Sequence, residues 1–431
     1  MILLKGGLVV DPESETTRIA DVLIEDGVIT NIGNIDIEAI DNANEVRIVD
    51  CEGLIVGPGL VDVHVHFRDP GFTYKEDIYT GAKAAARGGV TSVVLMANTK
   101  PSVDNIDTLN YVINKGRETD INIYTCASIT RGLQGKEIVD MDALLKAGAA
   151  GFTDDGIPIL DEDVARTAME EAAKRGAVLS FHEEDPRYIS NNGVNRGIGS
   201  EYFGIGGSDR QAEISMVKRD IDIALETGAR INLQHISTKE AVDLIREAKR
   251  SNRGKNIHAE ATPHHMSMTE EDIILHNTLA KMNPPLRTEE DRRAIIAGIK
   301  DGTLDIIATD HAPHSKEEKE KKITDAPSGI IGLETALTTC YKTLVKEEKL
   351  DILQVFCKFS GNPAKIYEIN AGALAIDRTA DLVIFDPKKE WIYNKSQSKS
   401  FNSPLKDQKI TGDVVMTICH GKIVYENLQI K

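Results

Sequence analysis

Short apolar runs alternate with longer amphipathic and charged stretches through the middle of the chain. Eight apolar runs have the length and composition of β-strands, at residues 61–67, 91–97, 122–128, 149–154, 177–182, 230–236, 256–262 and 304–310. Stretches of helical character lie between or after them, at residues 77–87, 104–118, 162–175, 214–227, 239–250, 289–300 and 333–346. Eight strands that alternate with helices are typical of a (β/α)8 barrel, so the pattern predicts an α/β fold of the TIM-barrel type rather than an open doubly wound sheet.

The two ends of the chain follow a different pattern. Short β-like runs occur at residues 2–10, 21–25, 28–32 and 46–49, and again at 380–385 and 413–424. We therefore expect residues 1–56 and 366–431 to form one small β-sandwich domain, and residues 57–365 to form the barrel. Residues 185–210 form a Gly- and Asn-rich insert after the fifth strand, for which we expect a lid or rim rather than a passive surface loop.

The composition is that of an ordinary globular protein, with 41% hydrophobic and 28% charged residues among 431. A net charge of −17 argues against nucleic acid and anionic membranes as partners, and an anionic substrate would require a local cationic clamp. The five cysteines are widely spaced without a Cys-x-x-Cys pair, which argues against a thiolate metal site and a disulfide framework. With no signal peptide or apolar run of about 20 residues, the sequence predicts a cytoplasmic protein.

The first of the eight strands ends in His64-Val65-His66. Residues i and i+2 of a strand point to the same face, so both imidazoles can approach one metal ion. Taken alone, the pair fits equally well with two unrelated histidines on a half-buried strand.

Other residues with metal-binding side chains recur at the ends of four further strands. They are Asp154, Asp155, His182, His235 and Asp310. In barrel enzymes the active site lies at this end of the strands, so the pattern favours a metal centre. Four histidines with two acids exceed the needs of one tetrahedral zinc, and they suffice for two metals if a carboxylate bridges them. Two-metal sites favour hydrolysis or its reversal.

Longer motifs carry a resemblance to a known family. Asp-Val-His-Val-His-Phe-Arg-Asp-Pro-Gly at 62–71, and Ala-Thr-Asp-His-Ala-Pro-His at 308–314 followed by Lys319, resemble the two signatures of class I dihydroorotases, which belong to the amidohydrolase superfamily. Further motifs at 96–99, 151–156, 233–237, 282–287 and 329–334 follow in the expected order. The resemblance covers essentially the whole chain.

The resemblance implies a role for each matching residue. His64 and His66 would bind one zinc, Asp155 would bridge to a second zinc held by His182 and His235, and Asp310 would complete the first shell and act as general acid and base. The neighbouring Asp154 remains an alternative bridge. Arg68, Asn98 and His314 would bind a substrate carboxylate, and Asn283, Ser328 and Gly329 would line the rest of the pocket. His264, His265 and His311 are interpreted as supporting residues rather than ligands.

The activity implied is the reversible cyclisation of N-carbamoyl-L-aspartate to L-dihydroorotate plus water, in pyrimidine synthesis. Two alternatives stay open: another cyclic amidohydrolase, such as an allantoinase or hydantoinase, and an inactive scaffold. Hydantoinases carry a carboxylated lysine on the fourth strand, where this chain has Asp154 and Asp155. Zinc, cobalt and manganese all suit such ligands. The resemblance also leaves open a homo-oligomer or an association with aspartate transcarbamoylase.

Overall fold

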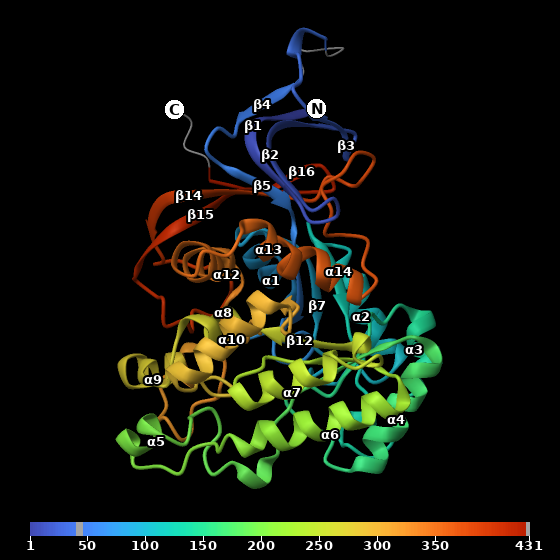
Figure 1. Ribbon diagram of the computed structural model, residues 1–431, viewed down its shortest axis with the longest axis vertical. Coiled ribbons are helices and arrows are strands. Elements are labelled where there is room, and N and C mark those ends of the chain that lie inside the picture. The colour runs from blue at the N-terminus through green and yellow to red at the C-terminus, as the bar shows by residue number, and fades with distance from the viewer. Residues whose placement is uncertain (40–45, 428–431) are drawn as a thin grey trace.

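The computed structural model describes residues 1–39 and 46–427. Figure 1 shows two parts: a β-sheet built from the N-terminal strands β1–β5 and the C-terminal strands β14–β16, and below it a set of strands surrounded by helices. Within the described residues, none of the helices combines the length and apolar character needed to cross a membrane.

The predicted barrel strands are all present, and each lies within or beside its predicted range. They are β6 (Leu60–Val65), β7 (Val90–Leu95), β8 (Asn122–Thr125), β9 (Phe152–Thr153), β10 (Val178–Phe181), β11 (Arg230–Leu233), β12 (Ile257–Ala261) and β13 (Ile306–Ile307). All neighbours pair in parallel, in the orders β6-β7-β8 and β13-β12-β11-β10-β9. The hydrogen-bonded barrel strands therefore form two arcs rather than one closed ring. The isolated β-bridges Ala127–Phe152 and Val65–His311 connect the two arcs.

Helices surround these strands, as the amphipathic stretches predict. The longer ones are α1 (Ile78–Arg87), α2 (Ile106–Gly116), α4 (Glu162–Arg175), α6 (Gln211–Thr227), α7 (Lys239–Lys249) and α10 (Glu289–Asp301). Side-chain caps fix several starts: Asp77 accepts from the Thr80 amide, and Thr288 accepts from the Asp291 amide. The last predicted helical stretch is divided into a 3-10 turn (Leu333–Thr335), α12 (Ala336–Cys340) and a π-helical segment (Tyr341–Glu347).

Shorter helices complete the connections. They are α3 (Met141–Ala147), α5 (Ile198–Phe203), α8 (Pro263–Ser267), α9 (Glu271–His276), α11 (Lys316–Lys319), α13 (Ile352–Phe356) and α14 (Asn362–Ile366). None of these is a separate element of the pattern-based prediction, because one or two turns are too short to establish a 3.6-residue period.

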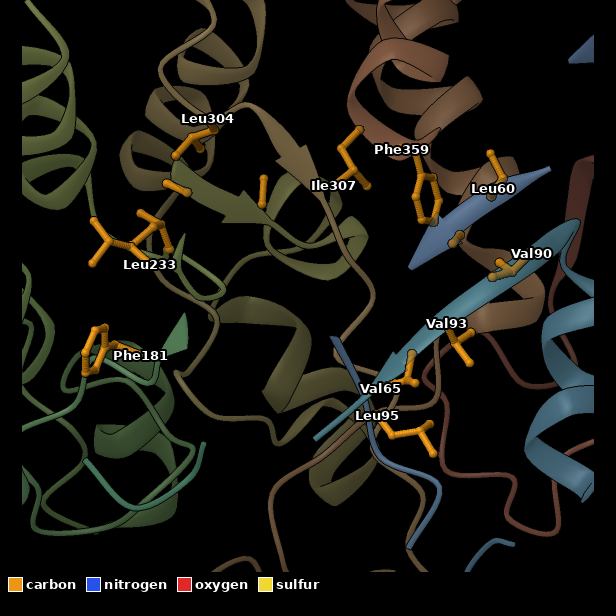
Figure 2. Packing of buried hydrophobic residues seen from close by; sticks show 14 of the residues in the cluster. Leu60, Val65, Val90, Val93, Leu95, Phe181, Leu233, Leu304, Ile307 and Phe359 are labelled. Carbon is orange, nitrogen blue, oxygen red and sulfur yellow. The ribbon is translucent and has the colours of Figure 1, made fainter. Parts of the chain in front are cut away.

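The barrel core is formed by aliphatic side chains that pair between adjacent strands. Leu60 of β6 lies beside Val90 of β7, and Val65 lies beside Leu95, all at most 4% exposed (Figure 2). Burial of one such side chain contributes about 1.5–3 kcal/mol. This packing fixes β6, and with it the direction of His64 on the strand and of His66 directly after it.

The terminal segments form one eight-stranded sheet, so both ends of the chain contribute to one β-structure, as predicted. Its strands are β1 (Ile2–Asp11), β2 (Thr16–Glu25), β3 (Val28–Gly33), β4 (Arg47–Asp50), β5 (Ile55–Pro58), β14 (Leu382–Ile392), β15 (Lys409–Cys419) and β16 (Lys422–Glu426). The order is β16-β15-β14-β5-β1-β2-β3, with β4 beside β1, so β5 and β14 join the two ends of the chain. Alternate residues of β14 serve two cores: Leu382 and Ile384 pack within the terminal sheet, while Val383 and Phe385 pack against the barrel.

Candidate functional site

The ends of five barrel strands bring six polar side chains together. His64 and His66 lie on or directly after β6, and each of the others follows a different strand: Asp155 (β9), His182 (β10), His235 (β11) and Asp310 (β13). All six are at most 6% exposed. The parallel arrangement causes this convergence, because the carboxyl ends of parallel strands meet at one end of a barrel.

Asp155 is the residue that connects the four histidines. Its Oδ1 lies 3.5 Å from His64 Nε2 and 3.5 Å from His182 Nδ1, and its Oδ2 lies 3.4 Å from His66 Nε2. The ligand atoms form two groups, His64–His66–Asp155 and Asp155–His182–His235, each within 4.8 Å. The structure thus brings the predicted ligands together as two triads that share one carboxylate.

The neighbouring Asp154 points elsewhere. Its carboxylate accepts hydrogen bonds from the backbone amides of Ile129 and Thr130, at 2.8 and 3.1 Å, and from the Thr130 hydroxyl. Asp154 therefore fastens the loop after β8, and the geometry favours Asp155 as the residue between the histidines.

The donor set fits metal ions. Within the described residues, His64 Nε2 has no hydrogen-bond partner although its side chain is fully buried. His182 Nδ1 and His235 Nε2 face each other at 3.0 Å. Buried polar atoms are normally satisfied, and imidazole nitrogens directed at a shared carboxylate are satisfied by a cation between them.

Two residues outside the predicted set orient two histidines of the triads. Glu260 at the end of β12 is fully buried, and its Oε2 accepts from His64 Nδ1 at 2.9 Å and from the His235 backbone amide at 3.3 Å. Glu184 Oε2 accepts from His182 Nε2 at 3.1 Å. In both cases the second ring nitrogen lies 3.5 Å from Asp155 Oδ1. Glu260 shares its strand-end position with the predicted ligands, and this position is the signal by which the sequence could have indicated it.

Asn98 also contacts the triads. His66 Nδ1 donates to Asn98 Oδ1 at 3.0 Å, and Asn98 Nδ2 donates to Asp155 Oδ2 at 3.0 Å. The predicted carboxylate-binding residue is thus hydrogen-bonded to two of the candidate ligands. Asn98 thus joins His66 and Asp155 through its amide group.

Asp155 and Asp310 are surrounded by groups that favour their ionised forms. Burial raises the pKa of the Asp310 carboxyl, but His66 and His64 outweigh it and lower the pKa to about 2. The same histidine environment holds the pKa of Asp155 well below its usual range despite burial. Both residues are therefore carboxylates at neutral pH, and Asp310 is available to accept a proton.

Three residues of the site adopt left-handed backbone conformations. The φ angles of Arg68, His235 and Asp310 are +59°, +34° and +49°. Non-glycine residues rarely adopt this region, and each instance costs about 1–3 kcal/mol that the surrounding packing must offset. All three strained residues lie at the site, where the left-handed backbone turns their side chains toward the cavity.

A cavity of about 410 Å³ opens onto the two triads. Every predicted substrate-binding residue lines it: Arg68, Asn98, Asn283, His314, Ser328 and Gly329. The structure adds Lys281 and Asn192 to this lining. Asn192 belongs to the 185–210 insert and accepts from the Ser328 hydroxyl at 2.9 Å, so the insert reaches the rim of the cavity.

The insert is anchored on its other side by Arg287. Its Nη1 donates to Asn195 Oδ1 at 2.7 Å and to the Ser208 carbonyl at 2.9 Å. Together with the Asn192 contact, these bonds place the insert as a rim, one of the two forms predicted for it.

Arg68 and His314 lie on one side of the cavity. His314 Nε2 donates to the Ser328 carbonyl at 2.8 Å, and its Nδ1 accepts from Lys75 Nζ at 3.3 Å. Burial and the charge of Arg68 lower the pKa of His314 far below its usual range, so this ring is neutral. Arg68 Nε donates to the Pro313 carbonyl at 3.3 Å. The guanidinium of Arg68 is thus the charged group of this pair.

The remaining histidines lie outside the triads. His265 Nε2 donates to the Pro284 carbonyl at 3.0 Å, while its Nδ1 accepts from the Thr262 hydroxyl at 2.9 Å. His311 Nδ1 accepts from the Gly332 amide at 3.2 Å. These contacts tie loops together around the site, and His264 likewise belongs to neither triad.

The sequence of this chain matches the model of the Amidohydrolase family over residues 55–424. The chain belongs to the amidohydrolase family. Metal-binding groups of histidine and aspartate, as in the two triads, suit the metal-dependent character of this family.

Dihydroorotases from other organisms align with nearly the whole chain. A dihydroorotase of Clostridioides difficile is 51% identical over 425 residues, covering 99% of this chain and 100% of that protein. A dihydroorotase of Lactococcus lactis is 47% identical over 427 residues, covering 99% of each. The resemblance predicted from the sequence motifs is confirmed.

Solved structures share the fold. The L-hydantoinase (dihydropyrimidinase) of Arthrobacter aurescens superposes with a TM-score of 0.87 at 23% identity, covering 100% of this chain and 97% of its own. The D-hydantoinase (dihydropyrimidinase) of a Thermus species gives 0.85 at 21% identity, covering 99% and 96%. At these identities the likeness concerns the fold alone, and it confirms the predicted barrel with a terminal β-domain.

Proposed function

We propose that this chain is a zinc-dependent dihydroorotase that interconverts N-carbamoyl-L-aspartate and L-dihydroorotate plus water in pyrimidine synthesis. One observation carries the proposal: two His/Asp triads that share Asp155 open onto the same cavity as Arg68. A metal centre beside a guanidinium suits a cyclic amide that bears a carboxylate. The 51% identity to a dihydroorotase over 99% of the chain supports this choice of substrate.

Two zinc ions are the proposed cofactors. His64, His66 and Asp310 would hold one ion, His182 and His235 the other, and Asp155 would bridge them. When bound, such ions polarise a carbonyl oxygen and lower the pKa of water. With the ions bound, Glu260 and Glu184 would accept the proton on the outer ring nitrogens of His64 and His182, which leaves the nitrogens that face Asp155 to bind the ions.

The chain's own residues account for proton transfer and orientation. In the hydrolytic direction water adds to the ring amide carbonyl, the Asp310 carboxylate accepts its proton, and the same carboxyl returns the proton to the ring nitrogen as the C–N bond breaks. Arg68, Asn98 and His314 are proposed to hold the substrate carboxylate, and Asn283, Ser328 and Gly329 to line the ring. Fixing the carboxylate orients the ring carbonyl toward the triads.

The assay that tests this function compares three cyclic amides. Purified protein with known zinc content should hydrolyse L-dihydroorotate in preference to allantoin and hydantoin, and it should hold about two zinc ions per chain. Preference for allantoin or hydantoin would contradict the substrate. Full zinc content without turnover on any of them would indicate an inactive scaffold.

Glu260→Gln is expected to weaken zinc binding by about 10- to 100-fold. The amide keeps the volume but replaces a charged acceptor of the His64 N–H with a neutral one that has a competing donor end. Competition with a chromogenic chelator measures the zinc affinity directly. Glu247→Gln, at an exposed position on α7, is the matched control, and equal affinities of the two variants would refute the role of Glu260.

The proposed domain division is a catalytic barrel at 57–365 with a β-domain at 1–56 and 366–431. A hydrophobic cluster of the terminal sheet supports it, because its buried members all come from the two terminal ranges. These ranges include residues 40–45 and 428–431, which lie outside the described part. We also propose a cytoplasmic location.

Self-association of the chain, or association with aspartate transcarbamoylase, is a separate proposal. Light scattering of the chain with and without aspartate transcarbamoylase would test both kinds of association.

A further inference from the structure

Lys319 belongs to the second signature stretch, yet the proposed mechanism gives it no task. Its side chain is 4% exposed, and its Nζ donates to the carbonyls of Pro327 and Gly329 at 3.0 Å each, and to that of Lys281 at 3.4 Å. The three hydrogen atoms of an ammonium group match these three acceptors. The Lys319 ammonium group therefore donates its hydrogen bonds to backbone carbonyl oxygens rather than to a carboxylate.

Lys281 holds the other end of the same segment. It is also 4% exposed, and its Nζ donates to the carbonyls of Ile323 and Ala326, at 2.7 and 2.6 Å. Its own carbonyl accepts from the Gly329 amide at 2.9 Å. Two buried lysines thus bind residues 323–329 from both ends through main-chain oxygens.

This segment is one wall of the substrate cavity. Thr324, Ala326, Pro327, Ser328 and Gly329 all line the cavity. Two further bonds fasten the wall: His314 donates to the Ser328 carbonyl at 2.8 Å, and Asn402 Nδ2 donates to the Gly329 carbonyl at 3.0 Å. The position of Ser328 and Gly329 relative to Arg68 consequently depends on the donors behind the wall.

We propose that Lys319, assisted by Lys281, is a positioning residue that sets the substrate-binding wall 323–329 through its main-chain carbonyls. The inference rests on the proposed function, and it explains why a lysine occupies this place in the signature. A buried ammonium is costly to desolvate, and a neutral side chain would fill the space without satisfying three converging carbonyls. Lys319 does not touch the triads, so its effect is on substrate binding rather than on metal binding.

The surroundings of Lys319 give the wall a pH dependence. Burial, and then the charge of Lys281, lower the pKa of Lys319 to about 7, while Glu318 acts in the opposite direction. His314, which also fastens the wall, is neutral throughout this range because its pKa is lowered by burial and Arg68. The ammonium form prevails below pH 7. Above it, a neutral amine has two hydrogen atoms for three acceptors, and the wall loses one of its bonds.

Lys319→Met tests the proposal in the zinc-loaded protein. We expect the KM for L-dihydroorotate to rise about tenfold while kcat changes about twofold at most, with unchanged zinc content. Hydrogen exchange of peptides that cover 323–329 should accelerate about tenfold. Lys321→Met is the matched control, since Lys321 is exposed and two residues away. Lys281→Met is the second variant and should accelerate exchange at the 323–326 end.

A measurement on the unmodified protein covers the case in which the variants fail to fold. Protection of 323–329, corrected for intrinsic exchange, should fall as pH rises from 6 to 9, whereas protection of the α4 helix should stay constant. Unchanged exchange in this segment would overturn the proposal. Faster exchange with an unchanged KM would also overturn it, since Lys319 would then be structural only. If the wild type does not turn over dihydroorotate, the proposed function has failed, and exchange alone decides whether the lysines hold the wall.

Discussion

Asp310→Ala should reduce turnover on the order of 10³-fold in both directions while the protein stays folded. General acid–base groups typically contribute about 10²- to 10⁴-fold. Asp310 lies at the end of β13, is 6% exposed, and has Oδ1 3.0 Å from His66 Nε2. No other carboxylate lines the cavity except Asp155, within the described residues, and Asp155 is hydrogen-bonded to Asn98 between the two triads. The loss of the Asp310 carboxylate therefore leaves no free carboxylate in the cavity to transfer the proton.

The measurement compares kcat for dihydroorotate hydrolysis and carbamoyl aspartate cyclisation, with zinc content and melting temperature determined on the same samples. Asp310→Asn preserves the shape and should lose a similar factor, because an amide cannot accept and return the proton. Asp222→Ala is the control, since that aspartate is exposed on α6 and pairs with Lys218. Turnover of Asp310→Ala near the wild-type value, at full zinc content, would refute the proton-transfer role.

The strand-end histidines and aspartates were predictable because their positions depend on one rule. Once the alternation indicates parallel strands in a barrel, the residues that follow each strand meet at one end, whatever their distance in sequence. His182 and His235 are 53 residues apart, yet their ring nitrogens lie 3.0 Å from each other. The eight strands were found for a similar reason, since buried parallel strands appear as continuous apolar runs.

The support around those residues was not predictable from the pattern. Glu260 lies in the strand Ile257–Ala261, and although its strand-end position points to the site, the sequence gives no indication that His64 is its partner. Its bond to His64 joins residues 196 positions apart. Lys319 belongs to a signature stretch and Lys281 appears in the sequence as an ordinary charge, and only the fold shows that both ammonium groups bind main-chain carbonyls. Such contacts depend on loop conformation, which local periodicity does not encode.

Three-dimensional packing also altered the predicted elements. The strand predicted at 149–154 is reduced to the two residues Phe152–Thr153. Ala149 and Ala150 connect α3 to this strand, and the Asp154 side chain turns to the loop after β8. The long helix expected at 333–346 is divided instead into 3-10, α and π segments. Its buried residues Leu333, Leu337 and Leu344 still belong to the barrel core, so the hydrophobic pattern was right where the helix type was not.

Arg68→Met is expected to raise the KM for dihydroorotate about 10- to 100-fold, with a smaller change in kcat. Methionine keeps the apolar stem and removes the guanidinium, whose charge-assisted bonds to a carboxylate contribute about 1.5–3 kcal/mol. The chain carries a net charge of −17, so a carboxylate approaches against the overall field and depends on this local cation. Arg250→Met, at the exposed end of α7, is the control and should leave the KM unchanged.

A substrate without the carboxylate separates binding from general damage to the site. Dihydrouracil has the ring of dihydroorotate but lacks its carboxylate, so Arg68 has nothing to pair with. If Arg68 binds the carboxylate, Arg68→Met lowers kcat/KM for dihydroorotate but not for dihydrouracil. The ratio of the two kcat/KM values then falls by the same factor as kcat/KM for dihydroorotate. Equal losses on both would show that the variant has disturbed the triads, since the loop that holds Arg68 at φ +59° follows directly from His66. An unchanged KM for dihydroorotate would remove Arg68 from the carboxylate site.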